Sequence, residues 1–338
     1  MQTAVFVGLL HALFDAFIGF IYANVPPFRW RWSVKEMPDL SGRVAIVTGG
    51  NLGIGFVTCL ELARRGAKVY LASRTESRAK SAIEEIKQLV PDAQLGFIHF
   101  DLTILSSAKA AAEEFMSKES RLDMLINNAG VMGTRYELSP DGIEVQACNA
   151  TGHFALTSHL LPILKRTASS VSDAHVRIVN VSSTAHITAT DPDLSSLEGI
   201  NRPNDWPMGR YGHSKLNNIL LTNELQKRLS DSNIYCLSVH PGVVASQLTR
   251  GIVSNSIANL YAEFGSYIIA RPSEGALTQL YAATSPEIES KRLRAAYLVP
   301  YGQVGRKSFL AEDHEGKLGR QFWHLCEKLM QEAENKQK

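Results

Sequence analysis

The sequence predicts a single α/β domain of the doubly wound type, with helices on both faces of a mainly parallel central sheet, preceded by an N-terminal hydrophobic helix. Three observations predict this class. Short apolar runs alternate along the chain with stretches of helical periodicity. The first of these runs turns into a helix through glycines, at residues 43–55 (RVAIVTGGNLGIG). The 338 residues suffice for one large α/β domain with additions, or for two small domains.

The composition argues against several classes of function. The net charge is only +2, so nothing indicates nucleic acid as a partner. The ten histidines form no H-E-x-x-H pattern, and we predict no metal site. The cysteines are scattered without a C-x-x-C pair, which favours reduced thiols in the core over disulfides or metal ligands. They are Cys59, Cys148, Cys236 and Cys326.

The mostly apolar run Thr3–Val25 predicts a membrane-associated helix over residues 1–25. As a helix it would span about 34 Å, enough for a bilayer core of about 30 Å. No Lys or Arg precedes it, unlike in a signal peptide. Aromatic and basic residues alternate over residues 28–32, a combination that a membrane–water boundary favours. We therefore expect residues 3–32 to contact a membrane or lipid-droplet surface, with the rest of the chain in the cytosol.

His11 and Asp15 leave three arrangements of this helix open. An aspartate at the centre of a spanning helix costs about 2.5–3.5 kcal/mol on insertion scales. The two residues share one helix face with small residues, which can pack on a partner helix or lie in the interface. The alternatives are a spanning helix, an interfacial helix and a helix packed on its own domain. Pro26-Pro27 ends the segment, and residues 26–41 are predicted to be a linker.

The strand predicted at Val44–Val47 stops at a glycine-rich turn, and a helix begins near Gly53 and closes at Gly66. Gly49 can adopt backbone angles closed to other residues. The free N–H groups and the positive dipole of the helix N-terminus suit a pyrophosphate, whereas a βα turn without a ligand is the alternative. The cofactor contacts predicted in this turn are Gly49, Asn51, Leu52, Gly53, Ile54 and Gly55.

The spacing of this turn, T-G-x-x-x-G-x-G, differs from the commoner G-x-G-x-x-G and resembles the short-chain dehydrogenase/reductase family. The resemblance implies a Rossmann fold, a nicotinamide cofactor and oxidoreductase activity. Further motifs of the family follow in the family's order over about residues 40 to 300.

The second strand, predicted at Lys68–Ala72, is followed by Ser73 and Arg74. An acidic residue here would accept a hydrogen bond from the ribose 2′-hydroxyl and favour NAD. A guanidinium instead suits a 2′-phosphate, and Arg74 lies close to the expected offset of about 20 residues from the glycine turn. We therefore predict NADP (NADPH) as the cofactor, bound by Ser73 and Arg74. The alternative is an exposed arginine that opens the helix at Ser77–Val90.

Two further strand ends are predicted to contact the cofactor. Asp101 and Leu102 follow the third strand, Leu95–Phe100, and precede a helix at Thr103–Lys118. The resemblance implies that Asp101 contacts the adenine ring, and a helix N-cap is the alternative. After the fourth strand, Leu122–Ile126, comes N-N-A-G, a second hallmark of the family, whose backbone the resemblance places along the cofactor. The predicted contacts there are Asn128, Ala129 and Gly130.

Asn149 and Ser183 match the first two members of the family's catalytic tetrad. Asn149 lies in a helix predicted at Asp141–Leu164, within a pattern that resembles N-x-x-G-x-F. The resemblance implies that it kinks the helix and holds a water of a proton relay. Ser183 ends the segment after the fifth strand, His175–Val181, and the resemblance implies that its hydroxyl binds the substrate oxygen. Without the resemblance, Asn149 would be interpreted as a residue that bonds to a neighbouring turn, and Ser183 as an ordinary serine in a turn.

Tyr211 and Lys215 match the last two members and lie on one face of a helix that ends near Ser230. A tyrosine with a pKa of about 10 is a poor acid–base at neutral pH, and a neighbouring ammonium lowers that pKa. The resemblance implies that Tyr211 moves the proton and that Lys215 also holds the nicotinamide ribose. A surface pair is the alternative for this motif alone. The insert His186–Arg210 resembles retinol-dehydrogenase-like members of the family.

The sixth strand, Ile234–Val239, precedes a stretch that resembles the family's P-G-x-V-x-T, whose backbone lines the nicotinamide. The apolar Ile252–Ala270 is interpreted as the cover of the substrate site, with core packing or membrane contact as alternatives. A helix at Pro272–Ala283, a strand at Ala295–Val299 and a polar, mostly helical C-terminus follow. The cofactor contacts predicted after the sixth strand are Pro241, Gly242, Val243 and Ser246.

The predicted organisation is a hydrophobic helix (1–25), a linker (26–41), a Rossmann-fold domain (42–309) and a C-terminal helical tail (310–338). The predicted function is NADP-dependent interconversion of an alcohol and an aldehyde or ketone. The expected substrate is lipophilic: a retinoid, another isoprenoid, a sterol or a long-chain aldehyde. The alternatives are a reductase that tailors a secondary metabolite, an idle NADP-binding scaffold and a cofactor sensor. We expect a membrane location, endoplasmic reticulum or lipid droplet, and the sequence is compatible with a homodimer.

Overall fold

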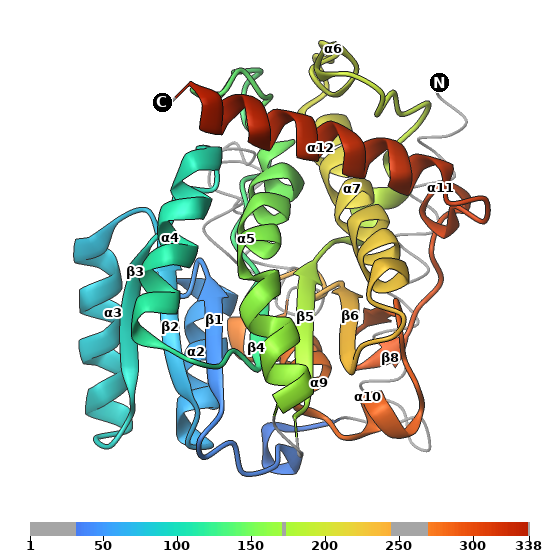
Figure 1. The fold of residues 1–338 in the computed structure, drawn as a ribbon. Coiled ribbons are helices and arrows are strands. Elements are labelled where there is room, and N and C mark those ends of the chain that lie inside the picture. The colour runs from blue at the N-terminus through green and yellow to red at the C-terminus, as the bar shows by residue number, and fades with distance from the viewer. Residues whose placement is uncertain (1–31, 171–173, 245–269, 337–338) are drawn as a thin grey trace, which may run out of the picture.

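The structure is a computed structural model that describes residues 32–170, 174–244 and 270–336. Within them the chain forms a doubly wound α/β fold (Figure 1), as the sequence predicts. The strands are β1 (Val44–Thr48), β2 (Lys68–Ser73), β3 (Leu95–His99), β4 (Met124–Asn127), β5 (Val176–Val181), β6 (Ile234–Val239), β7 (Tyr297–Val299) and β8 (Gln303–Val304). They form an eight-stranded sheet in the order β3-β2-β1-β4-β5-β6-β7-β8, parallel except for the edge strand β8.

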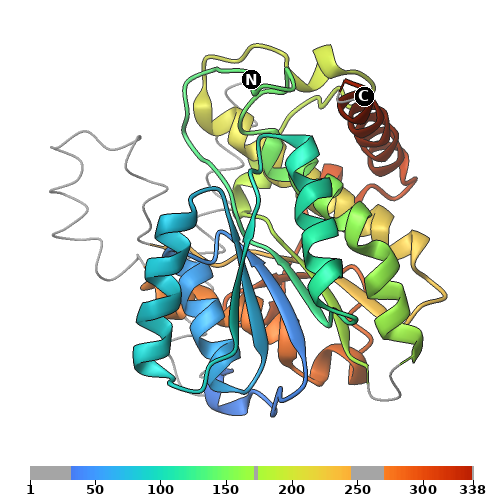
Figure 2. The ribbon, with the colours of Figure 1, turned by 60° about the vertical axis from the view of Figure 1, so that its left-hand side comes forward.

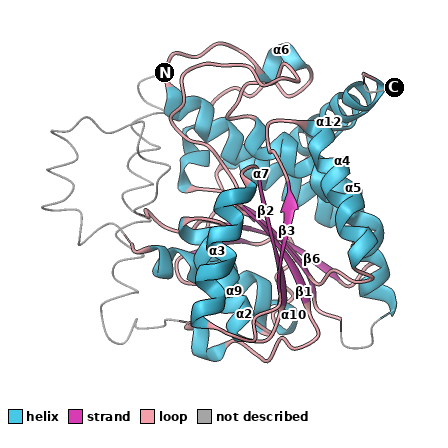
Figure 3. Cartoon of the chain, turned by 90° about the vertical axis from the view of Figure 1, so that its left-hand side faces the viewer, coloured by secondary structure: helices cyan, strands magenta, loops and turns pink. Residues whose placement is uncertain are grey.

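Helices cover both faces of this sheet. The longer ones are α2 (Gly53–Arg64), α3 (Glu76–Leu89), α4 (Leu105–Lys118), α5 (Cys148–Ser170), α7 (Pro207–Arg228), α9 (Pro272–Thr284) and α12 (Lys317–Asn335). Short ones are η1 (Val34–Glu36), η2 (Thr184–Thr188), α6 (Leu197–Ile200), α10 (Glu287–Ser290) and α11 (Phe309–Glu312). The sheet lies between α2, α3 and α9 on one side and α4, α5 and α7 on the other (Figures 2 and 3).

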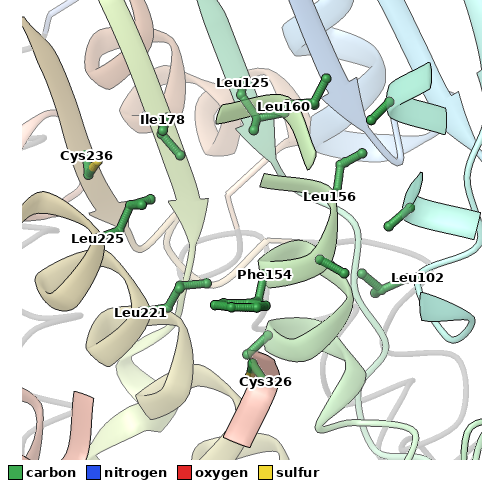
Figure 4. Packing of buried hydrophobic residues seen from close by; sticks show 14 of the residues in the cluster. Leu102, Leu125, Phe154, Leu156, Leu160, Ile178, Leu221, Leu225, Cys236 and Cys326 are labelled. Atoms are coloured by element: carbon green, nitrogen blue, oxygen red, sulfur yellow. The ribbon is translucent and has the colours of Figure 1, made fainter. Parts of the chain in front are cut away.

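Alternation along the strands divides the apolar residues between two cores. Because successive side chains of a strand point to opposite faces, Ala45 and Val47 pack under α2 and α9, whereas Val44 and Ile46 pack under α4 and α5. In the second core, Phe154 of α5 lies among side chains from several elements, including Leu102, Leu221 and Cys326 (Figure 4). All four cysteines are buried and free, as expected for reduced core thiols.

Two boundaries differ from the sequence prediction. The helix expected from Asp141 begins only at Cys148. Glu144 is the reason, because its carboxylate accepts the N–H groups of Gln146 and Ala147 (both 3.0 Å) and so closes a separate turn before the helix. The helix expected from Tyr211 begins one turn earlier, at Pro207, since proline suits the first helical position.

The expected linker is wrong for residues 32–41, which pack on the domain. Trp32 is 3 % exposed and meets Tyr281 of α9 edge-on, with ring centroids 5.6 Å apart. Met37 and Leu40 are buried in the same core. Trp32 is therefore a core residue and not the membrane-interface residue we expected. The predicted N-terminal helix lies outside the described residues, and among the described helices none is both long and apolar enough to cross a bilayer.

The C-terminal α12 lies across the outer side of α4, α5 and α7 (Figure 1). Its apolar face contributes Phe322, Trp323 and Leu329 to the second core. The Trp323 ring meets Phe154 edge-on at 4.9 Å and carries the Arg228 guanidinium at 4.3 Å on another side. This helix is thus packed as part of the domain.

Candidate active site

The glycine turn joins the carboxyl end of β1 to the N-terminus of α2. Gly49 has φ +66°, and Gly53 has φ +56° with open space where a side chain would be. A Cβ on Gly55 would lie 2.3 Å from the carbonyl oxygen of Gly49, so only glycine lets the helix approach the strand this closely. The N-cap Leu52 offers no side-chain hydrogen bond. The first N–H groups of α2 therefore have no capping side chain and can receive an anion.

The N-N-A-G segment is bonded directly to the end of β1. Thr48 Oγ1 accepts the N–H groups of Asn128 (2.8 Å) and Ala129 (2.9 Å), and Asn128 Nδ2 donates to the Thr48 carbonyl (2.8 Å). A Cβ on Gly130 would lie 3.2 Å from Asn149 Oδ1. The fold thus brings two of the predicted cofactor segments and Asn149 together at one edge of the sheet.

The ends of β2 and β3 carry the residues predicted for the adenosine half. Ser73 is buried, and its Oγ has no hydrogen-bond partner. Arg74 is exposed and has neither an ion pair nor a hydrogen bond within the described ranges. Asp101 Oδ1 accepts from the Thr103 N–H (2.9 Å) and hydroxyl (2.7 Å), so this oxygen closes a turn. Leu102 is mostly buried in the core.

Asn149 lies in the first turn of α5. The sequence had predicted it in the middle of a helix. Its Oδ1 accepts from the Val131 N–H (2.8 Å), and its Nδ2 donates to the Val131 carbonyl (2.9 Å) and to Ser214 Oγ (3.1 Å). Both amide hydrogens are therefore used, and the side chain joins the loop after β4 to α7. A water held by Asn149 would have to bind to its oxygens.

Ser183, Tyr211 and Lys215 meet beside the end of β5. Ser183 is the N-cap of η2, where its Oγ accepts the Ala185 N–H (3.1 Å), and its side chain is close enough to Tyr211 to influence the pKa of the phenol. Lys215 lies one turn after Tyr211 in α7, with its Nζ 5.4 Å from the centre of the tyrosine ring. The same Nζ donates to the Val181 carbonyl (2.8 Å). The structure thus places the predicted serine, tyrosine and lysine in one group.

Burial dominates the electrostatics of this group. It raises the pKa of the Tyr211 phenol, and the neighbouring Ser183 side chain acts in the opposite direction. It also lowers the pKa of the Lys215 ammonium to about 7. Burial therefore outweighs the lowering of the Tyr211 pKa that the sequence predicts from Lys215, because desolvation disfavours the charged form of both groups. At neutral pH Tyr211 carries its proton and can donate it.

The segment after β6 is only partly described. Pro241, Gly242 and Val243 follow the strand directly, Gly242 with φ +88° and Val243 with about half of its surface exposed. Val244 pairs with Ala270 as an isolated parallel bridge. The predicted contact Ser246 and the predicted cover at residues 252–269 lie outside the described residues.

Three polar residues that were not predicted from the sequence also support this site. Thr48 holds the N-N-A-G backbone, and its hydroxyl lies 2.9 Å from Nε2 of the buried His153. Nδ1 of that ring lies 2.8 Å from the Asn149 carbonyl. Asn218 donates to the same Val181 carbonyl as Lys215 (2.8 Å). The role of Asn218 could have been predicted from the sequence, because it lies one turn after Lys215 on the same helix. The role of His153 could not, because its ring bonds to Thr48, which is distant in the sequence.

A buried ion pair fixes the rim of the site. Arg210 Nε lies 3.1 Å from Glu144 Oε1, with both side chains at most 5 % exposed. Arg210 also donates to the carbonyls of Thr134 and Asn204. Glu144 N–H donates to the side chain of Asn201 (2.8 Å). These bonds join the loop after β4 to the predicted insert.

The residues at these strand ends fit a dinucleotide. A glycine turn leaves space and uncapped N–H groups for a pyrophosphate, the buried Ser73 hydroxyl lacks a partner, and the Arg74 guanidinium beside it is available for an anionic group. Within residues 32–170, 174–244 and 270–336, no group of His, Cys, Asp and Glu side chains is arranged to hold a metal ion.

Comparison with known proteins identifies similar chains. A family model described as short chain dehydrogenase matches residues 43–191. An uncharacterized oxidoreductase of Schizosaccharomyces pombe is 39 % identical over 305 residues, which cover 89 % of each protein. Retinol dehydrogenase 12 of Mus musculus is 37 % identical over 281 residues, 82 % of this chain and 85 % of that protein. The structure of Pseudomonas aeruginosa RhlG in an NADP active-site complex matches with a TM-score of 0.61 at 26 % identity, covering 78 % of this chain and 96 % of that one.

Proposed function

Because the chain belongs to the short-chain dehydrogenase/reductase family of NAD(P)-dependent oxidoreductases, with a retinol dehydrogenase among its relatives, we propose that it interconverts a lipophilic alcohol and its aldehyde or ketone with NADP. The observation that carries the proposal is the grouping of Ser183, Tyr211 and Lys215 beside the glycine turn and the N-N-A-G segment. A hydroxyl, a protonated phenol and a lysine next to a dinucleotide site suit carbonyl reduction.

The chemistry follows from the protonation of these groups. A bound nicotinamide supplies a hydride to the carbonyl carbon, or takes it up in the reverse direction. Tyr211 gives its proton to the carbonyl oxygen, so the products are an alcohol and a tyrosinate that is reprotonated from solvent. Ser183 donates a hydrogen bond to the same oxygen and stabilises the charge that develops there. Lys215 and Asn149 keep their predicted roles in this proposal: Lys215 holds the ribose and Asn149 anchors a water.

Arg74 supports NADP over NAD as the cofactor. It directly follows β2, where an acidic residue would favour NAD, and it has no competing partner among the described residues. The structure of Pseudomonas aeruginosa RhlG, which is 26 % identical, is an NADP complex and supports this choice.

A lipophilic substrate is supported by the relatives and by the sequence. Retinol dehydrogenase 12 is named for a long apolar alcohol and is 37 % identical. The stretch Ile252–Ala270, predicted to cover the substrate, is apolar and aromatic in sequence. A retinoid, another isoprenoid, a sterol and a long-chain aldehyde all fit this class.

The test is cofactor turnover by detergent-solubilised full-length protein, with NADPH or NADH and a panel of small and long apolar carbonyls. We expect NADPH-selective turnover of the long apolar carbonyls. Selective turnover of small polar ketones would favour a reductase of secondary metabolism. Tight NADPH binding with no turnover of any carbonyl would favour an idle scaffold or a cofactor sensor and would contradict the proposal.

We further propose that residues 3–31 attach the enzyme to the endoplasmic reticulum or to lipid droplets, with the catalytic domain in the cytosol. The apolar run and its basic flank support this proposal. Fractionation of cells that express the full chain, or a chain lacking residues 1–31, tests it. We expect the full chain in the membrane or droplet fraction and the shortened chain in the cytosol, and an unchanged distribution would contradict the proposal.

A further inference from the structure

The backbone carbonyl of Ser183 is held by a buried histidine. His186, in η2, donates to this oxygen twice: its backbone N–H lies 3.1 Å away and its ring Nδ1 2.7 Å away. The ring is 1 % exposed and packs edge-on against Tyr297, with centroids 5.1 Å apart. The main chain of Ser183 is therefore held by the side chain of His186.

The other nitrogen of the His186 ring binds a distant part of the chain. The backbone N–H of Ser308 donates to Nε2 at 3.1 Å. Because an N–H only donates and a carbonyl only accepts, the ring must carry its proton on Nδ1 and leave Nε2 free to accept. Burial lowers the pKa of His186 to about 4, so the ring is neutral at physiological pH. Both nitrogens are satisfied in a single tautomer.

Ser308 belongs to a segment (305–312) that is itself fixed on α7. Its Oγ accepts the N–H of Ala311 (3.3 Å) as the N-cap of α11, and α11 packs beside α7 (Figure 1). Asn223 of α7 donates to the Ala311 carbonyl (2.8 Å) and accepts from Lys307 Nζ (2.8 Å). The segment therefore has a defined position relative to the helix that carries Tyr211.

Helix η2 also contacts α7 next to Tyr211. A Cβ on Gly212 would lie 2.6 Å from the carbonyl oxygen of Ala185, so no side chain separates the two elements there. Helix η2, whose N-cap is Ser183, thus contacts both α7 and segment 305–312. A shift of either contact would change the position of the Ser183 hydroxyl relative to the Tyr211 phenol.

We propose that His186 is a positioning residue that links the Ser183 backbone to segment 305–312, so that this C-terminal segment helps to place the Ser183 hydroxyl against Tyr211. The inference rests on the proposed function, in which Ser183 binds the substrate oxygen. It assigns a catalytic consequence to a part of the chain that carries no recognisable motif.

A double-mutant cycle tests whether His186 acts through Ser183. We expect His186→Leu to lower kcat by about 10- to 100-fold, because small displacements of a catalytic group are costly, with KM for NADPH within about twofold of wild type. In a Ser183→Ala background the same substitution should lower kcat no further. His186→Asn, which keeps an N–H near the Nδ1 position but lacks the Nε2 acceptor for Ser308, should recover only part of the loss. An equal loss in both backgrounds would overturn the proposal.

A pair of substitutions at Ser308 isolates the C-terminal contact. Ser308 has φ −66°, which proline can adopt, so Ser308→Pro removes the N–H donor with little backbone strain. Ser308→Ala keeps this donor and removes only the cap hydroxyl. We expect kcat to fall about tenfold or more in Ser308→Pro and to stay within about twofold in Ser308→Ala. Equal kcat values in the two variants would overturn the link.

A readout without turnover separates this proposal from the proposed function. Nitrogen-15 NMR of histidine-labelled full-length protein reports which nitrogen carries the proton. We expect a His186 signal, assigned by its loss in His186→Leu, with the proton on Nδ1, and a changed Nε2 shift in Ser308→Pro. If the wild type turns over no carbonyl, the proposed function fails, and a proton on Nε2 or a charged ring would separately overturn the role of His186.

Discussion

Arg74 is the residue on which cofactor choice depends in this account. Its guanidinium is exposed at the end of β2, beside the unpaired hydroxyl of Ser73. A hydrogen bond to a charged group contributes about 1.5–3 kcal/mol, so Arg74→Ala should raise KM for NADPH by about 10- to 100-fold. KM for NADH should change little, because NADH has no 2′-phosphate. Arg78→Ala, at an exposed arginine one turn into α3, is the matched control.

Steady-state kinetics with both cofactors checks this prediction. Unchanged discrimination between NADPH and NADH in Arg74→Ala would contradict it. A loss of the same size in Arg78→Ala would show that general surface charge, and not Arg74, attracts the cofactor.

For single residues, the sequence predicted which residues belong to the candidate site better than it predicted their burial, pKa values and distant partners. The glycines at 49 and 55 and the pair Tyr211 and Lys215 were recognisable because their spacing is local and set by one turn or one helix face. The direction of the Tyr211 pKa was not, since it depends on burial by distant segments. His186 was seen only as the start of an insert, because its partner Ser308 lies far along the chain.

At the scale of elements, the ion pair between Glu144 and Arg210 joins the loop after β4 to the first turn of α7. Burial raises the pKa of Glu144, although the N–H groups it accepts and Arg210 act against this rise. Arg210→Met should therefore destabilise the fold by about 3–5 kcal/mol, because it leaves a carboxylate buried without its cation. Adding Glu144→Gln should recover part of this loss.

Chemical denaturation of the single and double variants measures these free energies. A change of less than about 1 kcal/mol in Arg210→Met would contradict the importance of the pair. A double variant less stable than Arg210→Met would mean that Glu144 matters chiefly for the turn it closes before α5.

Elements whose signals are local were predicted well, and those defined by tertiary contacts were not. The strands β1, β2, β5 and β6 appeared as apolar runs with clear ends, since both of their faces are covered by helices. The start of α5 was predicted too early. The Glu144 carboxylate accepts the N–H groups of Gln146 and Ala147, and so forms a separate turn before the helix. Residues 32–41 read as a linker, because the partner of Trp32 is Tyr281 on α9.

At the scale of the whole molecule, α12 closes the second core. Trp323 is 6 % exposed and contacts both Phe154 and Arg228. Truncating a buried aromatic residue costs about 3–5 kcal/mol, so Trp323→Ala should lower Tm by on the order of 5–15 °C. Phe309→Ala, at an aromatic residue that is 82 % exposed in α11, should leave Tm nearly unchanged.

Calorimetry or thermal circular dichroism of the two variants provides the comparison. A Tm for Trp323→Ala equal to that of wild type would mean that α12 does not stabilise the second core. A lower Tm in Phe309→Ala but not in Trp323→Ala would mean that α11, and not α12, stabilises the second core.

The same architecture explains the position of the candidate active site. In a doubly wound sheet the carboxyl ends of the parallel strands meet at one edge, and here β1, β2, β4 and β5 deliver the glycine turn, Arg74, the N-N-A-G segment and Ser183 to it. Helix α7 then brings Tyr211 and Lys215 alongside. We propose that this group performs proton transfer during NADPH-dependent carbonyl reduction.

The most direct test of that claim compares wild type with Tyr211→Phe in single-turnover reduction of a long apolar aldehyde, with NADPH binding measured in parallel. We predict NADPH affinity within about twofold of wild type and a rate lowered by about 10²- to 10⁴-fold, the contribution typical of a positioned general acid. A variant that binds NADPH and reduces the aldehyde as fast as wild type would contradict the account.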